Sequence, residues 1–217
     1  MINLVVKDLK KNFGGLHVLK GVSFEINGPE LIGLIGPNGA GKTTLTNVLD
    51  GAIKPNSGTV YLGGNRIDQL QPFEVARHGL GRTFQVTRSF RRMTVLENLM
   101  FTALALDQVL SMSEIDDNAM EVLEFLTVDH LRNEYAKSLS GGQQKLLELG
   151  RLLMLNPDVI ILDEPFAGVH PKLMEIIYKY IERVNNDGTA IILISHQMDS
   201  IFSLCNCLLY TSDAADE

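Results

Sequence analysis

A glycine-rich stretch of the sequence carries the residue types that can bind a phosphate group. It consists of Gly36, Pro37, Asn38, Gly39, Ala40, Gly41, Lys42, Thr43 and Thr44. Its spacing matches G-x-x-x-x-G-K-[ST], the phosphate-binding loop. Glycines let successive backbone N–H groups converge on an anion, and the start of the following helix adds a favourable dipole. We expect Lys42 to contact the β- and γ-phosphates of a nucleotide and Thr43 to offer its hydroxyl to Mg²⁺.

Two acidic residues end a continuous apolar run in the second half of the sequence. Val159 to Leu162 predicts a buried strand, and Asp163 and Glu164 follow it directly. A carboxylate at the end of a strand beside a phosphate-binding loop can hold Mg²⁺, a role that we assign to Asp163. Glu164 can then act as general base on the water that attacks the γ-phosphate. For the pair alone a solvated strand end is the alternative, but the phosphate-binding loop favours nucleotide hydrolysis.

A second candidate anion site lies in the middle of the chain. It is formed by Leu139, Ser140, Gly141, Gly142 and Gln143. Ser140 is the expected N-cap of a helical run from Gln144 to Leu153, and the backbone N–H groups at such a helix start favour an anion. An ordinary N-cap with a flexible lead-in is the alternative that this segment leaves open.

The elements that must position these residues follow from the spacing of apolar side chains. Strands are predicted at residues 4–6, 22–26, 31–35, 159–162 and 190–194, with a hairpin at 57–67 that turns at Gly63 and Gly64. Helices are predicted at residues 42–50, 144–153 and 171–184, and Ser111 with Glu114 forms a candidate capping box before a helix through Phe125. The stretch from 94 to 153 is helical in pattern and predicts an insertion into an α/β core with a mostly parallel sheet.

The composition excludes some classes of protein. The chain has 217 residues, 45% of them hydrophobic, and a net charge of −7, which argues against a general nucleic-acid binder with a basic face. Its apolar runs are strand-sized, shorter than the roughly 20 residues that cross a bilayer, and the first residues do not read as a signal peptide. We therefore expect a cytoplasmic protein. Cys205 and Cys207 are predicted to be buried structural residues in a strand.

The order of the motifs along the chain resembles that of the ATP-binding-cassette ATPases. The phosphate-binding loop comes first, followed by Gln85, the segment at 139–143, Asp163 with Glu164, and His196. Leu-Ser-Gly-Gly-Gln is the signature of that family and is rare in other phosphate-loop proteins. The resemblance extends from about residue 3 to about residue 209. It implies a P-loop NTPase core with an N-terminal antiparallel β subdomain and an inserted α-helical subdomain.

The resemblance also implies how nucleotide is bound. Two protomers are expected to form a head-to-tail dimer, with ATP between the phosphate-binding loop of one and the signature of the other. Ser140, Gly141 and Gly142 would then contact the γ-phosphate bound across the interface, and Gln143 belongs to the same nucleotide-binding set.

Isolated residues gain roles from the same resemblance. Gln85 matches the loop that touches Mg²⁺ and senses the transporter, with a surface glutamine as the alternative. His196 matches the switch histidine at the γ-phosphate, with an ordinary strand-end histidine as the alternative. Phe13 matches the aromatic residue that stacks on adenine, with a core phenylalanine as the alternative. The implied catalytic residues are Lys42, Glu164 and His196, and the implied metal ligands are Thr43, Gln85 and Asp163.

Within the family, three passages look most like the ATPases of branched-chain amino-acid importers. They are residues 13–16, residues 81–85 with 94–98, and residues 166–171. This chain has His170 where the importer branch has Asn before Pro171. The lipopolysaccharide-export ATPases share some of these features and are the nearest alternative. A soluble cassette protein acting on DNA or ribosomes, and a purely regulatory ATP binder, are less favoured by the acidic charge and by the full set of catalytic residues.

These expectations extend to domains and partners. Residues 1–209 are predicted to form one ATPase domain, with a catalytic core at 1–93 and 155–209 and a helical subdomain at 94–154. Residues 210–217 do not resemble the family, and we expect a truncated reading frame whose last seven residues pack poorly. The resemblance implies ATP and Mg²⁺ as cofactors. It also implies partners: transmembrane permease subunits, a second ABC ATPase in a homo- or heterodimer, and a solute-binding protein. These would hold the chain at the inner face of the plasma membrane.

Overall fold

The computed structural model describes residues 3–84, 88–105 and 110–210. Gln85 and the tail at 211–217 lie outside the described residues, so the predictions made for them are not addressed by the structure. The chain divides into two compact units. The first comprises residues 1–82, 157–163 and 184–217, and the second comprises residues 83–156 and 164–183.

The first unit contains an antiparallel sheet near its N-terminus. Its strands are β1 (Asn3–Phe13), β2 (Leu16–Asn27), β4 (Ser57–Leu62) and β5 (Asn65–Arg66), in the order β2-β1-β4-β5. Leu4 and Val6 alternate along β1 and are buried, while Val5 between them is only partly buried, as expected for a sheet with one covered face. The predicted hairpin is present, and Gly63 and Gly64 form its turn with positive φ.

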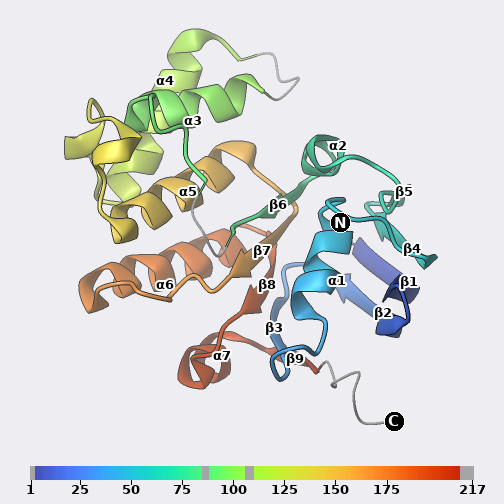
Figure 1. The fold of residues 1–217 in the computed structure, drawn as a ribbon. Helices are drawn as coiled ribbons and strands as arrows, with labels where there is room; N and C mark the ends of the chain where they lie inside the picture. The colour runs from blue at the N-terminus through green and yellow to red at the C-terminus, as the bar shows by residue number, and fades with distance from the viewer. Residues whose placement is uncertain (1–2, 85–87, 106–109, 211–217) are drawn as a thin grey trace. The chain divides into compact units, whose positions relative to one another are not determined.

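A parallel sheet forms the other half of the same unit. Its strands are β3 (Leu31–Ile35), β6 (Leu80–Arg82), β7 (Val159–Asp163), β8 (Ala190–Ile194) and β9 (Cys207–Tyr210). They lie in the order β6-β7-β8-β3-β9, and every pairing is parallel. All five residues of β8 are buried, because helices or loops cover both faces of a parallel sheet. Figure 1 shows these strands side by side, with β8 between β7 and β3.

Helices α1 (Lys42–Leu49), α2 (Pro72–Arg77) and α7 (Met198–Leu204) complete the first unit. Leu45, Val48 and Leu49 of α1 enter one apolar core together with residues of both sheets. This core therefore fixes the start of α1, and with it the glycine-rich loop, relative to the parallel sheet.

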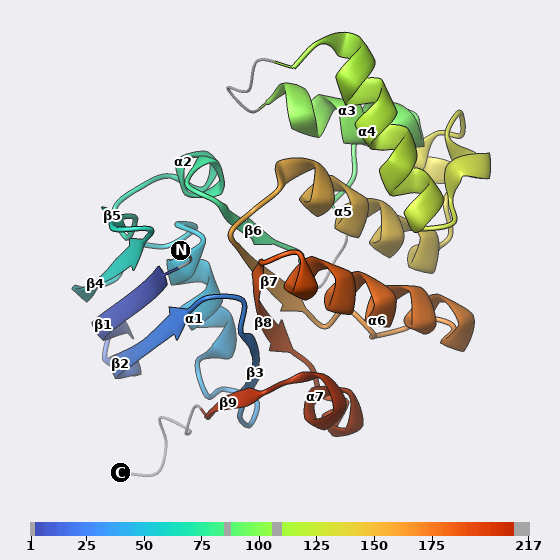
Figure 2. The same ribbon diagram turned by 180° about the vertical axis from the view of Figure 1, so that it is seen from behind.

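The second unit is helical. It contains α3 (Val95–Leu104), α4 (Met112–Phe125), the short turns η1 (Asp129–Leu131) and η2 (Ala136–Ser138), α5 (Gly141–Leu155), and most of α6 (Pro171–Asn186). Helices α3, α4 and α5 contact one another, and Figure 2 shows α3 and α4 against α5. Thr94, Ser111 and Ser140 begin α3, α4 and α5, each with a complete capping box. Among the helices that the structure describes, none combines the length and hydrophobicity that crossing a membrane requires.

The predicted α/β fold class is confirmed, with its antiparallel N-terminal sheet, parallel core sheet and helical insertion. The prediction for the cysteines was wrong in part. Cys207 lies in a strand, at the start of β9, but it is exposed, and Cys205 is the half-buried C-cap of α7 rather than a strand residue. The spacing was misread because α7 is too short for its period to separate from the strand that follows.

Candidate nucleotide-binding and hydrolysis site

The order of the parallel strands gathers several predicted site residues of the first unit at one edge of the sheet. Strand β8 pairs with β3 on one side, where Gly33 lies beside Leu193, and with β7 on the other, where Asp163 lies beside Ile194. The carboxyl ends of parallel strands meet at one edge, which is the usual place for a ligand in such sheets. The glycine-rich loop after β3, Asp163 at the end of β7 and His196 just after β8 therefore belong to the same edge.

The glycine-rich loop turns sharply into α1. Gly41 is the N-cap of α1 with φ +86°, and the N–H of Leu45 donates to its carbonyl oxygen at 2.8 Å. The positive φ favours glycine here, and a Cβ would also be tightly placed, 3.2 Å from the side chains of Leu19 and Val18. Of the loop, Pro37, Asn38 and Gly39 are exposed. The N-terminus of α1 is thus held against the core while the loop before it stays accessible.

Lys42 lies back across its own loop. Its Nζ donates to the carbonyl oxygens of Gly36 at 2.5 Å and Pro37 at 2.8 Å. The ammonium group is therefore held at the loop. When a phosphate binds there, its charged oxygens would replace the two carbonyl oxygens as acceptors of the Lys42 hydrogen bonds. Thr43 is exposed beside it, in the first turn of α1.

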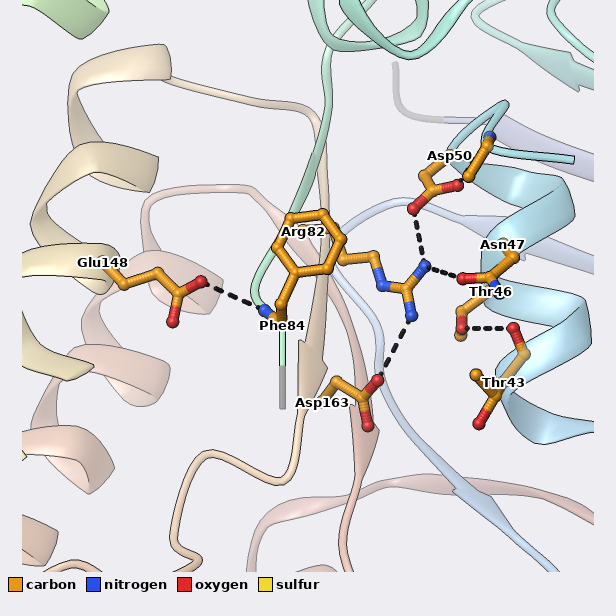
Figure 3. Close-up of polar contacts among 9 residues, drawn as sticks. Thr43, Thr46, Asn47, Asp50, Arg82, Phe84, Glu148 and Asp163 are labelled. Atoms are coloured by element: carbon orange, nitrogen blue, oxygen red, sulfur yellow. Dashed lines mark hydrogen bonds and ion pairs between the residues drawn. The ribbon is translucent and has the colours of Figure 1, made fainter. Parts of the chain in front are cut away.

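Arg82 joins the loop helix to the end of β7. Its Nη1 donates to Asp50 at 2.6 Å and to Asn47 at 2.7 Å, and its Nη2 donates to Asp163 at 3.2 Å. Figure 3 shows the guanidinium between α1 and Asp163. The three charged side chains are 5%, 11% and 14% exposed for Arg82, Asp50 and Asp163. The role of Arg82 could not be predicted from the sequence, because an arginine three positions before Gln85 carries no signal for partners so distant in the chain.

Glu164 begins the second unit and follows Asp163 directly in the chain. Its backbone is in the left-handed region at φ +50°, and only 8% of the residue is exposed. A left-handed conformation is uncommon for a glutamate and persists only where its surroundings impose it. The N–H of Ala167 donates to the Glu164 carbonyl oxygen at 3.2 Å, and Phe166 is buried and stacks on Tyr178 with ring centroids 4.9 Å apart. The loop after the strand is therefore tightly held.

The signature segment forms the start of α5. The Ser140 hydroxyl accepts a hydrogen bond from the Gln143 N–H at 3.4 Å, and the Gln143 Oε1 accepts one from the Ser140 N–H at 2.9 Å. Ser140 and Gly141 are exposed, and a Cβ at Gly141 would meet nothing within 4 Å. A Cβ at Gly142 would instead lie 2.5 Å from Leu173 of α6. The capping interpretation thus holds, and the exposed helix start can still present N–H groups to an anion.

A buried carboxylate in the second unit was also missed. Glu148 of α5 accepts a hydrogen bond from the Phe84 N–H at 3.1 Å, next to the undescribed residues 85–87 (Figure 3). Burial raises the pKa of Glu148 to about 7, although this hydrogen bond and the charges of Arg151 and Lys145 oppose the rise. Glu148 therefore ties the segment that precedes Gln85 to α5.

Three further positions singled out in the sequence are Phe13, His196 and His170. Phe13 ends β1 and is 50% exposed, with the Lys11 ammonium 5.2 Å from its ring centroid, so the ring is not part of the core. His196 is exposed just after β8. His170 acts at the start of α6, where its Nδ1 accepts a hydrogen bond from the Lys172 N–H at 3.3 Å and its carbonyl accepts one from the Leu173 N–H at 2.8 Å. The residue that departs from the importer branch thus caps a helix.

The donors at the sheet edge suit a nucleotide with Mg²⁺. Thr43 offers a hydroxyl and Asp163 a partly accessible carboxylate, which are the oxygen ligands that Mg²⁺ prefers. Within the described ranges no cluster of three or more His, Cys, Asp or Glu side chains could hold a metal on its own. The remaining ligands would be phosphate and water oxygens, as is usual for Mg²⁺ at nucleotide sites.

Comparison with known proteins gives concordant results. Residues 19–167 match the family described as ABC transporter. The chain is 36% identical over 211 residues to a probable branched-chain amino acid transport ATP-binding protein LivG of Methanocaldococcus jannaschii, covering 92% of this chain and 82% of that one. It is also 36% identical over 205 residues to the lipopolysaccharide export system ATP-binding protein LptB of Escherichia coli, covering 94% and 85% of the two chains.

Solved structures show the same likeness. A nucleotide-free ATP-binding cassette from an ABC transporter superposes with a TM-score of 0.85 at 35% identity, covering 99% of this chain and 89% of that one. The dimeric structure of a bacterial ABC transporter cassette has a TM-score of 0.86 at 26% identity, covering 97% and 95%.

Proposed function

The chain belongs to the ABC transporter family of ATP-binding proteins and is an ABC transporter ATPase, and on this premise we propose that it powers the import of branched-chain amino acids. The observation that carries the substrate class is the likeness to LivG proteins of three organisms, at 36%, 35% and 37% identity. The passage at 166–171, although it holds His170, supports the same branch.

Glu164 is the general base in this proposal. It would polarise the water that attacks the γ-phosphate, while Lys42 contacts the β- and γ-phosphates and His196 contacts the γ-phosphate. Phosphoryl transfer needs little covalent work from the protein, so positioning and charge stabilisation supply most of the rate. A Mg²⁺ ion held by Thr43, Asp163 and Gln85 would neutralise charge on the phosphate oxygens. Phe13, with its exposed ring, would stack on the adenine.

A dimer completes the site. We expect the exposed start of α5, with Ser140, Gly141, Gly142 and Gln143, to contact the nucleotide held by the phosphate-binding loop of a second cassette. A helix N-terminus suits the γ-phosphate because its N–H groups and dipole favour an anion. The likeness to a dimeric bacterial cassette supports this arrangement. The second cassette is either another copy of this chain or a related ATPase.

The remaining partners follow from the same proposal. ABC ATPases work with permease subunits, so the chain would act at the inner face of the plasma membrane through them. An importer of this class would also use a solute-binding protein. We assign no nucleic-acid partner, since the net charge of −7 gives no general basic face.

Lipopolysaccharide export is the second candidate, because the likeness to LptB has the same identity of 36% and covers 94% of the chain. The two are separated by reconstituting the chain in vesicles with the permease subunits encoded beside its gene, in the presence of the solute-binding protein that import would use. Accumulation of labelled leucine that depends on MgATP and is lost in Glu164→Gln would support import. Nucleotide-dependent release of lipopolysaccharide from the vesicles, without leucine uptake, would support export instead.

A further inference from the structure

We propose that Lys145 is a positioning residue that holds the loop carrying the general base Glu164 and thereby ties that loop to the signature helix. This inference rests on the proposed hydrolysis by Glu164. It assigns a role to a lysine that lies outside every motif described above.

The Lys145 side chain donates hydrogen bonds to the loop that follows β7. Its Nζ donates to the carbonyl oxygens of Glu164 at 2.7 Å, Pro165 at 3.4 Å and Ala167 at 2.7 Å. A lysine ammonium has three N–H donors, so one side chain can serve all three acceptors. Lys145 and the whole loop belong to the second unit. The ammonium therefore gathers carbonyl groups of residues 164–167 around one point.

The hydrogen bonds from Lys145 matter for this loop because its first residue, Glu164, has a strained backbone. Glu164 has φ +50°, and Lys145 bonds the carbonyl group of this same residue. Turning the backbone of Glu164 back to an ordinary conformation would swing that carbonyl away from the ammonium. The hydrogen bond thus favours the backbone conformation that sets where the Glu164 carboxylate points.

The surroundings of the Lys145 ammonium act on its pKa in opposite directions. Burial is the larger effect and lowers the pKa of Lys145, while the negative charges of Glu148 and Glu164 oppose this fall. The two carboxylates face the ammonium from its own helix and from the loop that it holds. Both therefore favour the protonated side chain that can donate to three carbonyl groups.

The position of Lys145 on α5 allows it to transmit a movement of the signature segment to the loop that carries Glu164. Helix α5 begins at Gly141, and Lys145 follows Ser140 by little more than one turn. A helix is stiff over this length, so a displacement of the signature end would be transmitted to the carbonyl groups that Lys145 holds. When the signature engages nucleotide on a second cassette, Lys145 would pass that event to the base in its own protomer.

The test compares three variants in MgATP hydrolysis, nucleotide affinity and backbone exchange. Lys145→Met keeps the aliphatic stem but removes the donors, Lys145→Arg keeps a positive donor, and Lys179→Met is the control at an exposed lysine of α6 in the same unit. We expect Lys145→Met to lower kcat by about 100-fold, as for a misplaced catalytic group, with KM and nucleotide affinity within about twofold of wild type. Lys145→Arg should recover most of kcat, and Lys179→Met should match wild type.

Hydrogen–deuterium exchange provides a readout that does not need turnover. Amides of residues 166–169 should exchange faster in Lys145→Met than in wild type or Lys179→Met, while the amides of α5 (Gly141–Leu155) exchange as in wild type. Unchanged kcat and unchanged exchange in Lys145→Met would overturn the proposal. The proposal would also be overturned if Lys145→Met lost nucleotide binding and thermal stability as strongly as it lost kcat, since that would mark a general structural role. Absence of hydrolysis in the wild-type chain would instead refute the proposed function, while the exchange data would still decide whether Lys145 holds the loop.

Discussion

The arginine bridge between α1 and β7 leads to a quantitative prediction for stability. The guanidinium of Arg82 lies 2.6 Å from Asp50 and 3.2 Å from Asp163, and its side chain is 5% exposed. Replacing it by methionine keeps most of the volume but leaves two carboxylates facing each other without a counter-charge. Their side chains are only 11% and 14% exposed, so water replaces the lost partner poorly.

The size of the stability loss depends on whether the ion pairs of Arg82 with Asp50 and Asp163 behave as buried or as surface pairs. Surface pairs contribute about 0–1 kcal/mol, whereas removing one partner of a buried pair costs about 3–5 kcal/mol. The burial of all three groups selects the second case. We therefore expect Arg82→Met to lower the free energy of unfolding by about 3–5 kcal/mol.

Urea denaturation followed by circular dichroism measures this change through the midpoint at constant m. Adding Asp50→Asn to Arg82→Met should return part of the loss, because one of the uncompensated charges is then removed. In a double-mutant cycle the two sites should couple by about 0.5–3 kcal/mol, the range for residues in contact. A change of less than about 1 kcal/mol in Arg82→Met would refute the argument, since the network would then be worth no more than a surface pair.

Three other predictions concern single positions. Because the pKa of Glu148 rises from 4.5 to about 7 in the folded chain, its ionisation destabilises the fold as pH increases through that interval. Relative to wild type, the free energy of unfolding of Glu148→Gln should therefore rise by about 3 kcal/mol between about pH 4.5 and pH 8, as measured by urea denaturation. A difference between the two proteins that does not change with pH would contradict this. Gly58→Ala should destabilise the chain by about 1–3 kcal/mol more than Gly63→Ala in thermal melts. Both glycines have positive φ, but only at Gly58 would a Cβ meet backbone, 2.4 Å from the Asp8 carbonyl oxygen; equal losses would contradict the clash. His170→Ala should cost about 1 kcal/mol by loss of the α6 cap while His170→Asn should not, and identical melts of the two variants would show that the ring does not cap.

The sequence predicted the features whose causes are local. The turn into α1 follows from Gly41 and its neighbours, the capping box at Ser111 from residues three positions apart, and the N-cap at Ser140 from the helical run after it, so each could be read from one short segment. The buried strands at 31–35 and 190–194 were found at their observed bounds, because continuous apolar runs of that length have few alternatives.

The contacts that hold the site together could not be predicted in this way. Arg82 and Asp163 are separated by 81 positions, and Lys145 donates to backbone carbonyl groups, which every residue possesses. Such contacts depend on how strands and helices pack, and no residue type in the sequence marks them. The short strand β6 and the short helix α2 were missed because few residues carry too little periodicity.

The assignment of Glu164 as the general base is tested most directly by phosphate release from the purified chain and from Glu164→Gln at saturating MgATP. We expect the wild-type chain to turn over and the variant to lose hydrolysis while it still binds ATP and forms the closed dimer, which light scattering after gel filtration detects. Hydrolysis by Glu164→Gln at the wild-type rate, with equal nucleotide binding, would contradict the assignment of the general base and the mechanism built on it.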